Sequence, residues 1–103
     1  MPISKILELY ARCGQSLAGK GLCEAALPLS ETSNALTLFE QQHWRVLGGD
    51  VYMQIDSGEL EATYENWFYE GNSSTDSVSA ARDFIENFTD CAVHVVFVLD
   101  DQG

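Results

Sequence analysis

Three carboxylates in the middle of the chain have types and spacing that could do chemistry. Asp50 follows the glycine pair Gly48-Gly49, while Glu59 and Glu61 lie two residues apart and would share one face of a strand. Carboxylates placed in this way can exchange protons or hold a divalent metal ion. However, the 103-residue chain contains sixteen acids, so such a pair is expected by chance. The spacing favours a solvated strand face, and we expect no catalytic residue, no metal site and no cofactor.

The other residue types used in catalysis give weaker signals. Gly48-Gly49 is not typical of a phosphate-binding loop, because Lys and Ser/Thr do not follow it and the charge of Asp50 would repel phosphate. A structural role is favoured for His94, inside the apolar segment AVHVVFV, and for His43, near a predicted helix end. The cysteines are odd in number and lack C-x-x-C spacing, which argues against a zinc site or a disulfide framework and favours a reducing cytoplasm: Cys13, Cys23 and Cys91.

The negative charge is concentrated in the second part of the chain. Residues 1–45 carry four acids and four Lys or Arg residues, whereas residues 46–103 carry twelve acids and one cation, Arg82. Such a surface repels nucleic acid and anionic membranes and attracts basic proteins. No apolar run is long enough to span a membrane, and the N-terminus lacks the apolar stretch of a secretory signal. We expect a basic protein partner; the alternative is that the acids serve only solubility.

Aromatic residues alternate with acids in EATYENWFYEG, residues 61–71. Alternation along a strand sends some rings into the core and leaves others near the surface. Exposed rings fringed by charge are typical of protein interfaces, where a rigid ring contributes apolar area at a small entropic cost. The alternative is that Trp67 anchors the core and Asn66 caps a turn. The predicted partner-binding residues are Asp50, Tyr52, Glu59, Glu61, Glu65, Trp67, Tyr69 and Glu70.

The predicted helices and strands that position these residues indicate one α+β domain over residues 1–103. Helices and strands are mixed without strict βαβ alternation, so we expect a mainly antiparallel sheet packed with three helices. The turn of the hairpin is predicted at Asp56-Ser57-Gly58, and the last strand is apolar enough to be covered on both faces. The predicted helices span residues 2–20, about 30–43 with Ser30 as N-cap, and about 77–89; the predicted strands form a hairpin over about 45–65 and a C-terminal strand over about 91–99.

The glycine pair needs its own explanation, because two glycines weaken a strand. We hypothesise that Gly48-Gly49 lets the chain pass close to a neighbour, either the Trp67 ring or the third helix, at a bulge or turn. Asp50 is then either held internally by backbone donors or Arg82, or it projects outward to meet arginines of a partner. The residues expected to be structural are Gly48, Gly49, Asn66 and Arg82.

RVLGGDVY, TYENW and SAARDFIENF together resemble the immunity protein 40 family of bacterial polymorphic toxin systems. The matching residues are Leu47–Tyr52, Thr63–Trp67 and Ser79–Ile85, and the resemblance spans roughly residues 24–90. A departure is Glu65, where the family pattern would have Asp. The resemblance implies a cytoplasmic, non-enzymatic antidote that binds and neutralises a cognate toxin domain, for example a basic nuclease.

Two other function classes stay open. An acidic DNA-mimic inhibitor of a nucleic-acid-binding enzyme would use the same acidic surface, and it would inhibit several DNA-binding proteins. A small metal hydrolase would be built on Asp50, Glu59 and Glu61, and it would bind a divalent metal ion. The sequence is compatible with a monomer and with a homodimer.

Overall fold

The computed structural model describes residues 2–16 and 25–100. The strands form one antiparallel sheet in the order β1-β2-β5-β3-β4. The predicted α+β class, with three helices and a mainly antiparallel sheet, is therefore confirmed. In chain order the elements are α1 (Pro2–Cys13), β1 (Gln15–Ser16), β2 (Ala25–Pro28), α2 (Leu29–Gln41), β3 (Arg45–Gln54), β4 (Leu60–Phe68), α3 (Ser74–Ile85) and β5 (Val93–Asp100).

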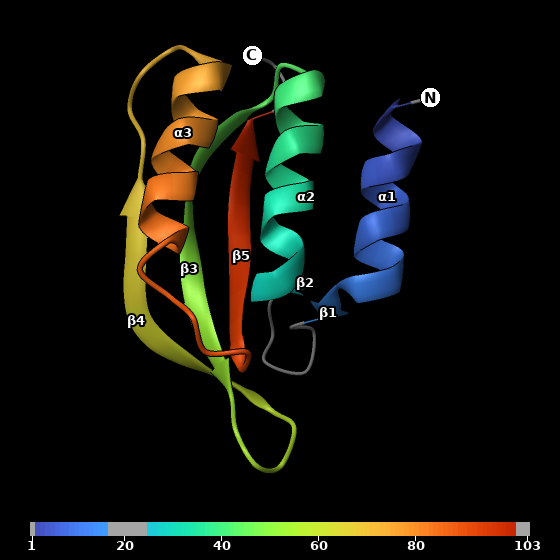
Figure 1. Ribbon diagram of the computed structural model, residues 1–103, viewed down its shortest axis with the longest axis vertical. Helices are drawn as coiled ribbons and strands as arrows, with labels where there is room; N and C mark the ends of the chain where they lie inside the picture. Colours follow the sequence, from blue (N-terminus) through green and yellow to red (C-terminus); the bar gives the residue numbers. More distant parts are fainter. Residues whose placement is uncertain (1, 17–24, 101–103) are drawn as a thin grey trace.

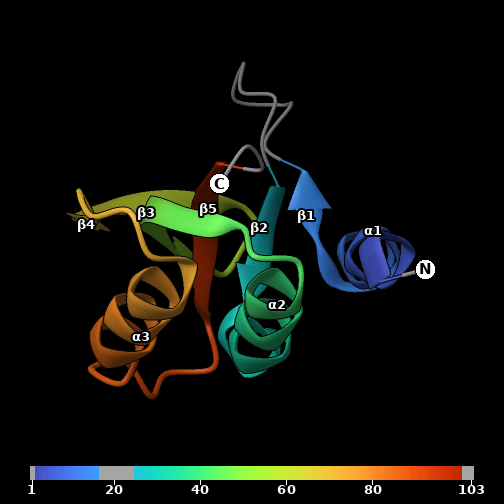
Figure 2. The same ribbon diagram turned by 90° about the horizontal axis from the view of Figure 1, so that it is seen from above.

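The helices are arranged on one side of the sheet. Helices α2 and α3 lie side by side over one face, and α1 lies beside α2 on the side away from α3 (Figures 1 and 2). Within the described ranges no helix covers the other face, which we call the helix-free face (Figure 2). Strand β4 is the last strand on its side of the sheet, so it forms an edge next to α3 (Figure 1). None of the described helices is both long and apolar enough to cross a bilayer.

The first two helices differ from their predicted limits. Helix α1 ends at Cys13 and strand β1 follows, so the prediction of helix as far as residue 16 is wrong, and residues 17–20 lie outside the described ranges. Helix α2 begins at Leu29, directly after Pro28, whose backbone is extended (φ −62°, ψ 148°). Pro28 is therefore the N-cap position, and Ser30 already lies inside the helix.

Helix α3 begins and ends three to four residues earlier than the sequence predicts, because side chains fix both ends. The hydroxyl of Ser73 accepts a hydrogen bond from the backbone N–H of Asp76 (3.1 Å), which makes Ser73 the N-cap. At the other end, the amide of Asn87 donates to the carbonyl oxygen of Phe84 (3.0 Å), and the helix stops at Ile85.

The main core lies between the helices and the sheet. The ring of Phe39 on α2 meets Phe97 of β5 edge-on at 5.5 Å between centroids, and it stacks on Trp44 at 6.1 Å. Such ring pairs stabilise a core beyond the area they bury. The buried members of this core are Ile6, Leu9, Leu27, Ala35, Leu36, Phe39, Val46, Val51, Val78, Ala81, Val93, Val95 and Phe97.

A second, smaller cluster is formed by Ala26, Tyr52, Leu60 and Val96. Alternate residues of β5 belong to the two clusters, so this strand is covered on both faces, as its continuous apolar sequence predicts. His94 is also buried, and its Nδ1 lies 3.0 Å from the carbonyl oxygen of Ala92. The predicted structural role of this histidine is confirmed.

Candidate functional site

The glycine pair lies where β3 is packed tightly between β4 and β5. The pairing of β3 with β5 shifts between Val46 and Gly48, which marks a bulge. A Cβ on Gly48 would collide with the carbonyl oxygen of Trp67. A Cβ on Gly49 would come within 2.6 Å of the Trp67 ring and of the Val96 carbonyl oxygen. The hypothesis that the glycines make room for Trp67 at a bulge is confirmed.

The space made by Gly49 lets Trp67 join the hairpin to α3. Its half-buried ring stacks on Phe84 of α3, with 4.7 Å between centroids and 27° between planes. The same ring meets Phe97 of β5 edge-on at 6.0 Å. Trp67 therefore anchors the core, which was the alternative to its role in partner binding.

The structure corrects the proposed internal pairing of Asp50 with Arg82. Asp50 is exposed, and no described residue pairs with its carboxylate. Arg82 instead donates hydrogen bonds from α3 to two hydroxyls of α2, those of Ser33 (3.0 Å) and Thr37 (2.9 Å). The physical reason is strand alternation: Gly49 faces the Trp67 ring and α3, so Asp50 must face the other way. The Asp50 side chain therefore projects outward, and its contact with arginines of a partner stays a prediction.

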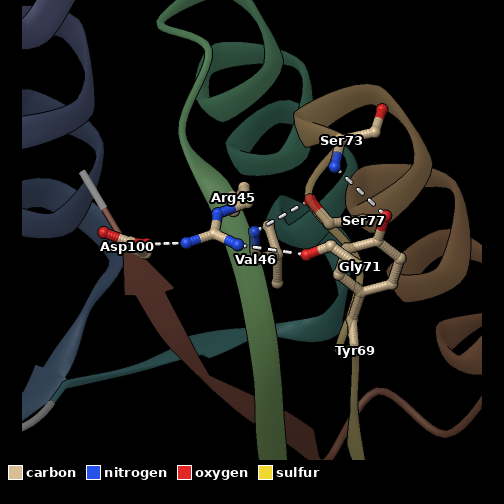
Figure 3. Close-up of polar contacts among 7 residues, drawn as sticks. All are labelled: Arg45, Val46, Tyr69, Gly71, Ser73, Ser77 and Asp100. Atoms are coloured by element: carbon tan, nitrogen blue, oxygen red, sulfur yellow. Dashed lines mark hydrogen bonds and ion pairs between the residues drawn. The ribbon is translucent and has the colours of Figure 1, made fainter. Parts of the chain in front are cut away.

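A polar clamp joins the start of β3 to β5 and to α3 (Figure 3). Arg45 forms an ion pair with Asp100 at the end of β5 and donates to the carbonyl oxygen of Gly71 (3.0 Å), in the loop before α3. The buried hydroxyl of Ser77 accepts a hydrogen bond from the backbone N–H of Val46 (2.9 Å). These contacts hold the root of the hairpin, and the sequence interpretation did not identify either Arg45 or Ser77 as important.

Two of the predicted partner-binding rings turn inward. Tyr52 is buried on the helix-free face, with 9% of its surface exposed, so its placement in a partner-binding surface is wrong. Tyr69 is half-buried, and its hydroxyl accepts a hydrogen bond from the backbone N–H of Ser73 at the start of α3 (3.3 Å; Figure 3). The ring of Tyr69 therefore supports the loop between β4 and α3.

The rings that do face solvent are Tyr64 and Phe68, which are 89% and 75% exposed. Both lie on the edge strand β4, within the segment that the sequence singles out for its aromatic residues. Burying a large ring is favourable by about 1.5–3 kcal/mol, so two rings left in water on one strand are a marked departure from the rest of this fold. Exposed rings grouped in this way are typical of surfaces that another protein covers.

Tyr64 is presented by a wide bulge in β4. Asp50 pairs with Asn66 and Tyr52 pairs with Ala62, so residues 63–65 together oppose a single residue of β3. The hydroxyl of Thr63 braces the bulge, since it donates to the carbonyl oxygen of Val51 (3.1 Å) and accepts from the N–H of Glu65 (3.2 Å).

The bulge also holds Tyr64 in a strained conformation. Its backbone is left-handed, with φ of 67°, which costs a non-glycine residue about 1–2 kcal/mol. Strain of this kind is found most often at functional positions. Asn66, one step beyond the bulge, is an exposed member of β4, so its expected role as a turn cap is wrong.

Carboxylates flank these rings along the chain. Residues 46–81 contain seven acids and no Lys, Arg or His. Most of these acids belong to β3, β4 and the segments that follow each strand, and no cation lies among them in sequence to reduce their field. The predicted partner-binding acids are all exposed: Asp50, Glu59, Glu61, Glu65 and Glu70.

The same acids are not assembled into a catalytic or metal-binding group. Asp50 is on the helix-free face, whereas Glu61 pairs with Met53, which packs against the helix-side core. Directly paired residues share a face, so Asp50 and Glu61 lie on opposite faces of the sheet. In the described part of the chain no three His, Cys, Asp or Glu residues are placed to hold a metal ion. The geometry does not support the hydrolase alternative.

These features define a small α+β protein whose most distinctive surface is built from exposed rings and carboxylates, as in proteins that act by binding other proteins. A family model described as Immunity protein 40 matches residues 16–99, and the chain belongs to this family. Immunity proteins are parts of toxin systems; they bind a cognate toxin and are generally not enzymes. Comparisons with curated proteins and with solved structures gave no match.

Proposed function

We propose that this immunity protein neutralises a toxin domain with a basic surface by binding it through the β3–β4 hairpin. We use the name hairpin surface for the exposed rings and carboxylates on both faces of the hairpin and in the segment after it: Asp50, Glu59, Glu61, Tyr64, Glu65, Phe68 and Glu70. The observation that carries the proposal is the exposure of Tyr64 and Phe68, 89% and 75%, on a strand rich in carboxylates. Trp67 and Tyr69 hold β4 and the segment after it in place. Trp67 stacks on Phe84 of α3, and the Tyr69 hydroxyl accepts a hydrogen bond from the N–H of Ser73, at the start of α3.

The charge of the hairpin surface supports a basic partner. Opposite charges steer diffusing proteins together, and association can then reach about 10⁸–10⁹ M⁻¹s⁻¹ at low salt. In tight complexes, close charge pairs couple by about 1.5–7 kcal/mol. A fast antidote is useful because a toxin does damage for as long as it stays free.

A nuclease domain is the toxin class that fits this surface best. Nucleases bind a polyanion and need a cationic cleft to do so, and carboxylates on a protruding hairpin are complementary to such a cleft. The protein would then act where the nuclease finds its substrate, in the cytoplasm of the producing cell. The free thiols of Cys13 and Cys91 are compatible with that compartment.

The test is binding to the cognate toxin, which we expect to be the C-terminal domain of a secreted protein encoded immediately upstream of this chain. Calorimetry and stopped-flow association should be measured with the wild type and with Glu61→Gln/Glu65→Gln. We expect the variant to bind more slowly and more weakly, by about tenfold for each carboxylate that forms a close pair. Affinity of the wild type should fall steeply between low and high salt.

A matched control is Asp83→Asn/Glu86→Gln, which removes the same charge from exposed positions on and just after α3. This control should bind almost as tightly as the wild type. Equal weakening by both variants would show that only net charge matters, and the hairpin surface would lose its proposed role. An inhibited toxin whose binding is insensitive to salt and to both variants would refute the electrostatic part altogether.

A further inference from the structure

A groove crosses the helix-free face of the sheet at Gly48. Phe68 of β4 and Val98 of β5 are both register partners of Gly48, and they are 75% and 42% exposed. Since Gly48 has no side chain, nothing projects between them from β3. The resulting groove has a volume of about 210 Å³. Neighbouring strands are about 4.8 Å apart, so its two walls are about 10 Å apart at the backbone, enough for one extended side chain.

The end of the groove is polar and negatively charged. Asp50 lies two residues beyond Gly48 on the same strand, so both belong to the helix-free face. Asn66 is the register partner of Asp50 on β4, and both residues line the groove. Neither side chain is paired with another described residue, and both are exposed. The groove thus combines two apolar walls with a carboxylate and an amide at one end.

We propose that this groove is the pocket for one arginine side chain of the toxin. The inference rests on the proposed function, because a basic partner supplies the arginine. The aliphatic stem of arginine would lie between Phe68 and Val98, and the planar guanidinium would lie against the Phe68 ring. Its fork of N–H donors would reach the Asp50 carboxylate and the Asn66 carbonyl oxygen together. Lysine offers a single ammonium group without a planar face, so it fits this set of acceptors less well.

The local charge supports a cationic occupant over an apolar one. Seven carboxylates and no cation are found between residues 46 and 81, so an apolar side chain in the groove would leave Asp50 desolvated beside it. Arg45, the nearest cation along β3, is already engaged by Asp100 and the carbonyl of Gly71. Within the described ranges, therefore, no cation of the chain itself contacts the exposed Asp50 carboxylate at the groove.

The groove can be tested without the toxin. The full ¹⁵N-labelled chain is titrated with N-acetyl-arginine amide, and with the same derivatives of citrulline, which is a neutral isostere, and of lysine. We expect arginine to move the amide signals of Gly48, Gly49, Asp50 and Phe68, with saturation in the millimolar range. Citrulline and Asp50→Asn should each weaken this binding about three- to fivefold, as expected for an exposed charge pair. Asp83→Asn is the matched control and should leave the binding unchanged.

The outcomes separate this inference from the proposed function. If citrulline and arginine shift the same signals equally, or if arginine shifts signals elsewhere on the chain only, the groove is not an arginine pocket, even when the toxin still binds the hairpin surface. If arginine binds at the groove but the toxin is insensitive to Glu61→Gln/Glu65→Gln, the groove is still an arginine pocket, but the proposed function falls and with it the assignment of that arginine to the toxin. In the toxin complex itself, Phe68→Ala and Asp50→Asn should weaken binding non-additively, because one side chain contacts both; strict additivity overturns the proposal.

Discussion

Replacing Gly49 with alanine tests the packing that holds the hairpin to α3. The added methyl group would lie within 2.6 Å of the Trp67 ring and of the Val96 carbonyl oxygen. The oxygen belongs to the central strand β5 and cannot move aside as a flexible side chain would, and the ring is held by Phe84 and Phe97. Overpacking of this kind costs about 1–3 kcal/mol.

The expected net effect follows from two opposing terms. The φ of Gly49 is not in the left-handed region, so alanine adds no backbone strain there. Alanine also lowers the entropy of the unfolded chain, which stabilises the folded state by about 0.4–1 kcal/mol. With the gain subtracted from a mid-range overpacking cost, we expect Gly49→Ala to lower the free energy of unfolding by about 1.3 kcal/mol and Tm by about 7 °C. Urea denaturation followed by tryptophan fluorescence and near-ultraviolet circular dichroism measures both the loss and the change around Trp67.

A double-mutant cycle with Trp67→Leu identifies the cause. With the ring removed, the penalty of Gly49→Ala should shrink by about 1 kcal/mol, and the contact with the Val96 oxygen accounts for the remainder. Gly58→Ala is the control: nothing lies within 4 Å of its Cβ, so it should cost only the left-handed backbone penalty and be independent of Trp67. A Gly49→Ala protein as stable as the wild type, or an equal penalty in both backgrounds, would refute the reasoning.

Three further outcomes are expected. Ser77→Ala removes the acceptor of the Val46 N–H and leaves that donor buried, so urea denaturation should show a loss of about 1–3 kcal/mol, and no loss would mean that water replaces the hydroxyl. Tyr64→Gly should be about 1 kcal/mol more stable than Tyr64→Ala, because only the backbone strain differs, while both weaken toxin binding; equal stabilities would show that the bulge is unstrained. Burial raises the pKa of Tyr10 from 10.0 to about 12, so the folded state keeps a proton that the unfolded state loses. Stability should therefore fall by about 2 kcal/mol as the pH rises from about 10 to about 12, and Tyr10→Phe, measured by urea denaturation at both pH values, should lack this fall.

The strands with clear alternation could be predicted from the sequence, and so could the central position of β5. Strand β2 could not, because Ala25–Pro28 is short, contains a proline and shows no alternation; its pairing with β5 joins residues far apart in the chain. Arg45 and Asp100 are separated by 55 positions, and no local spacing predicts a contact at that distance. The role of Gly48-Gly49 was predictable, since two adjacent glycines in a strand indicate close backbone approach.

Which aromatic rings are exposed depends on the bulge at residues 63–65 of β4, which the amino-acid composition does not reveal. Alternation predicts that some rings face inward, and Leu60, Ala62 and Asn66 do share one face. The bulge at 63–65 adds an even number of residues, so the alternation resumes in phase and Trp67 reaches α3 while Phe68 faces out. Only the register of β3 against β4 reveals this bulge. In a continuous strand, Tyr64 would share one face with Leu60 and Ala62.

The bulge in β4 also affects whether copies of the protein associate with one another at high concentration. An antidote has to be stockpiled before its toxin appears, and a sheet whose last strand offers an unbroken row of N–H and C=O groups can recruit further copies of itself. The bulge at 63–65 breaks that row, and the carboxylates of Glu61, before the bulge, and Glu65, within it, repel a second identical edge. The geometry that displays Tyr64 to a partner therefore also discourages self-polymerisation along the same border.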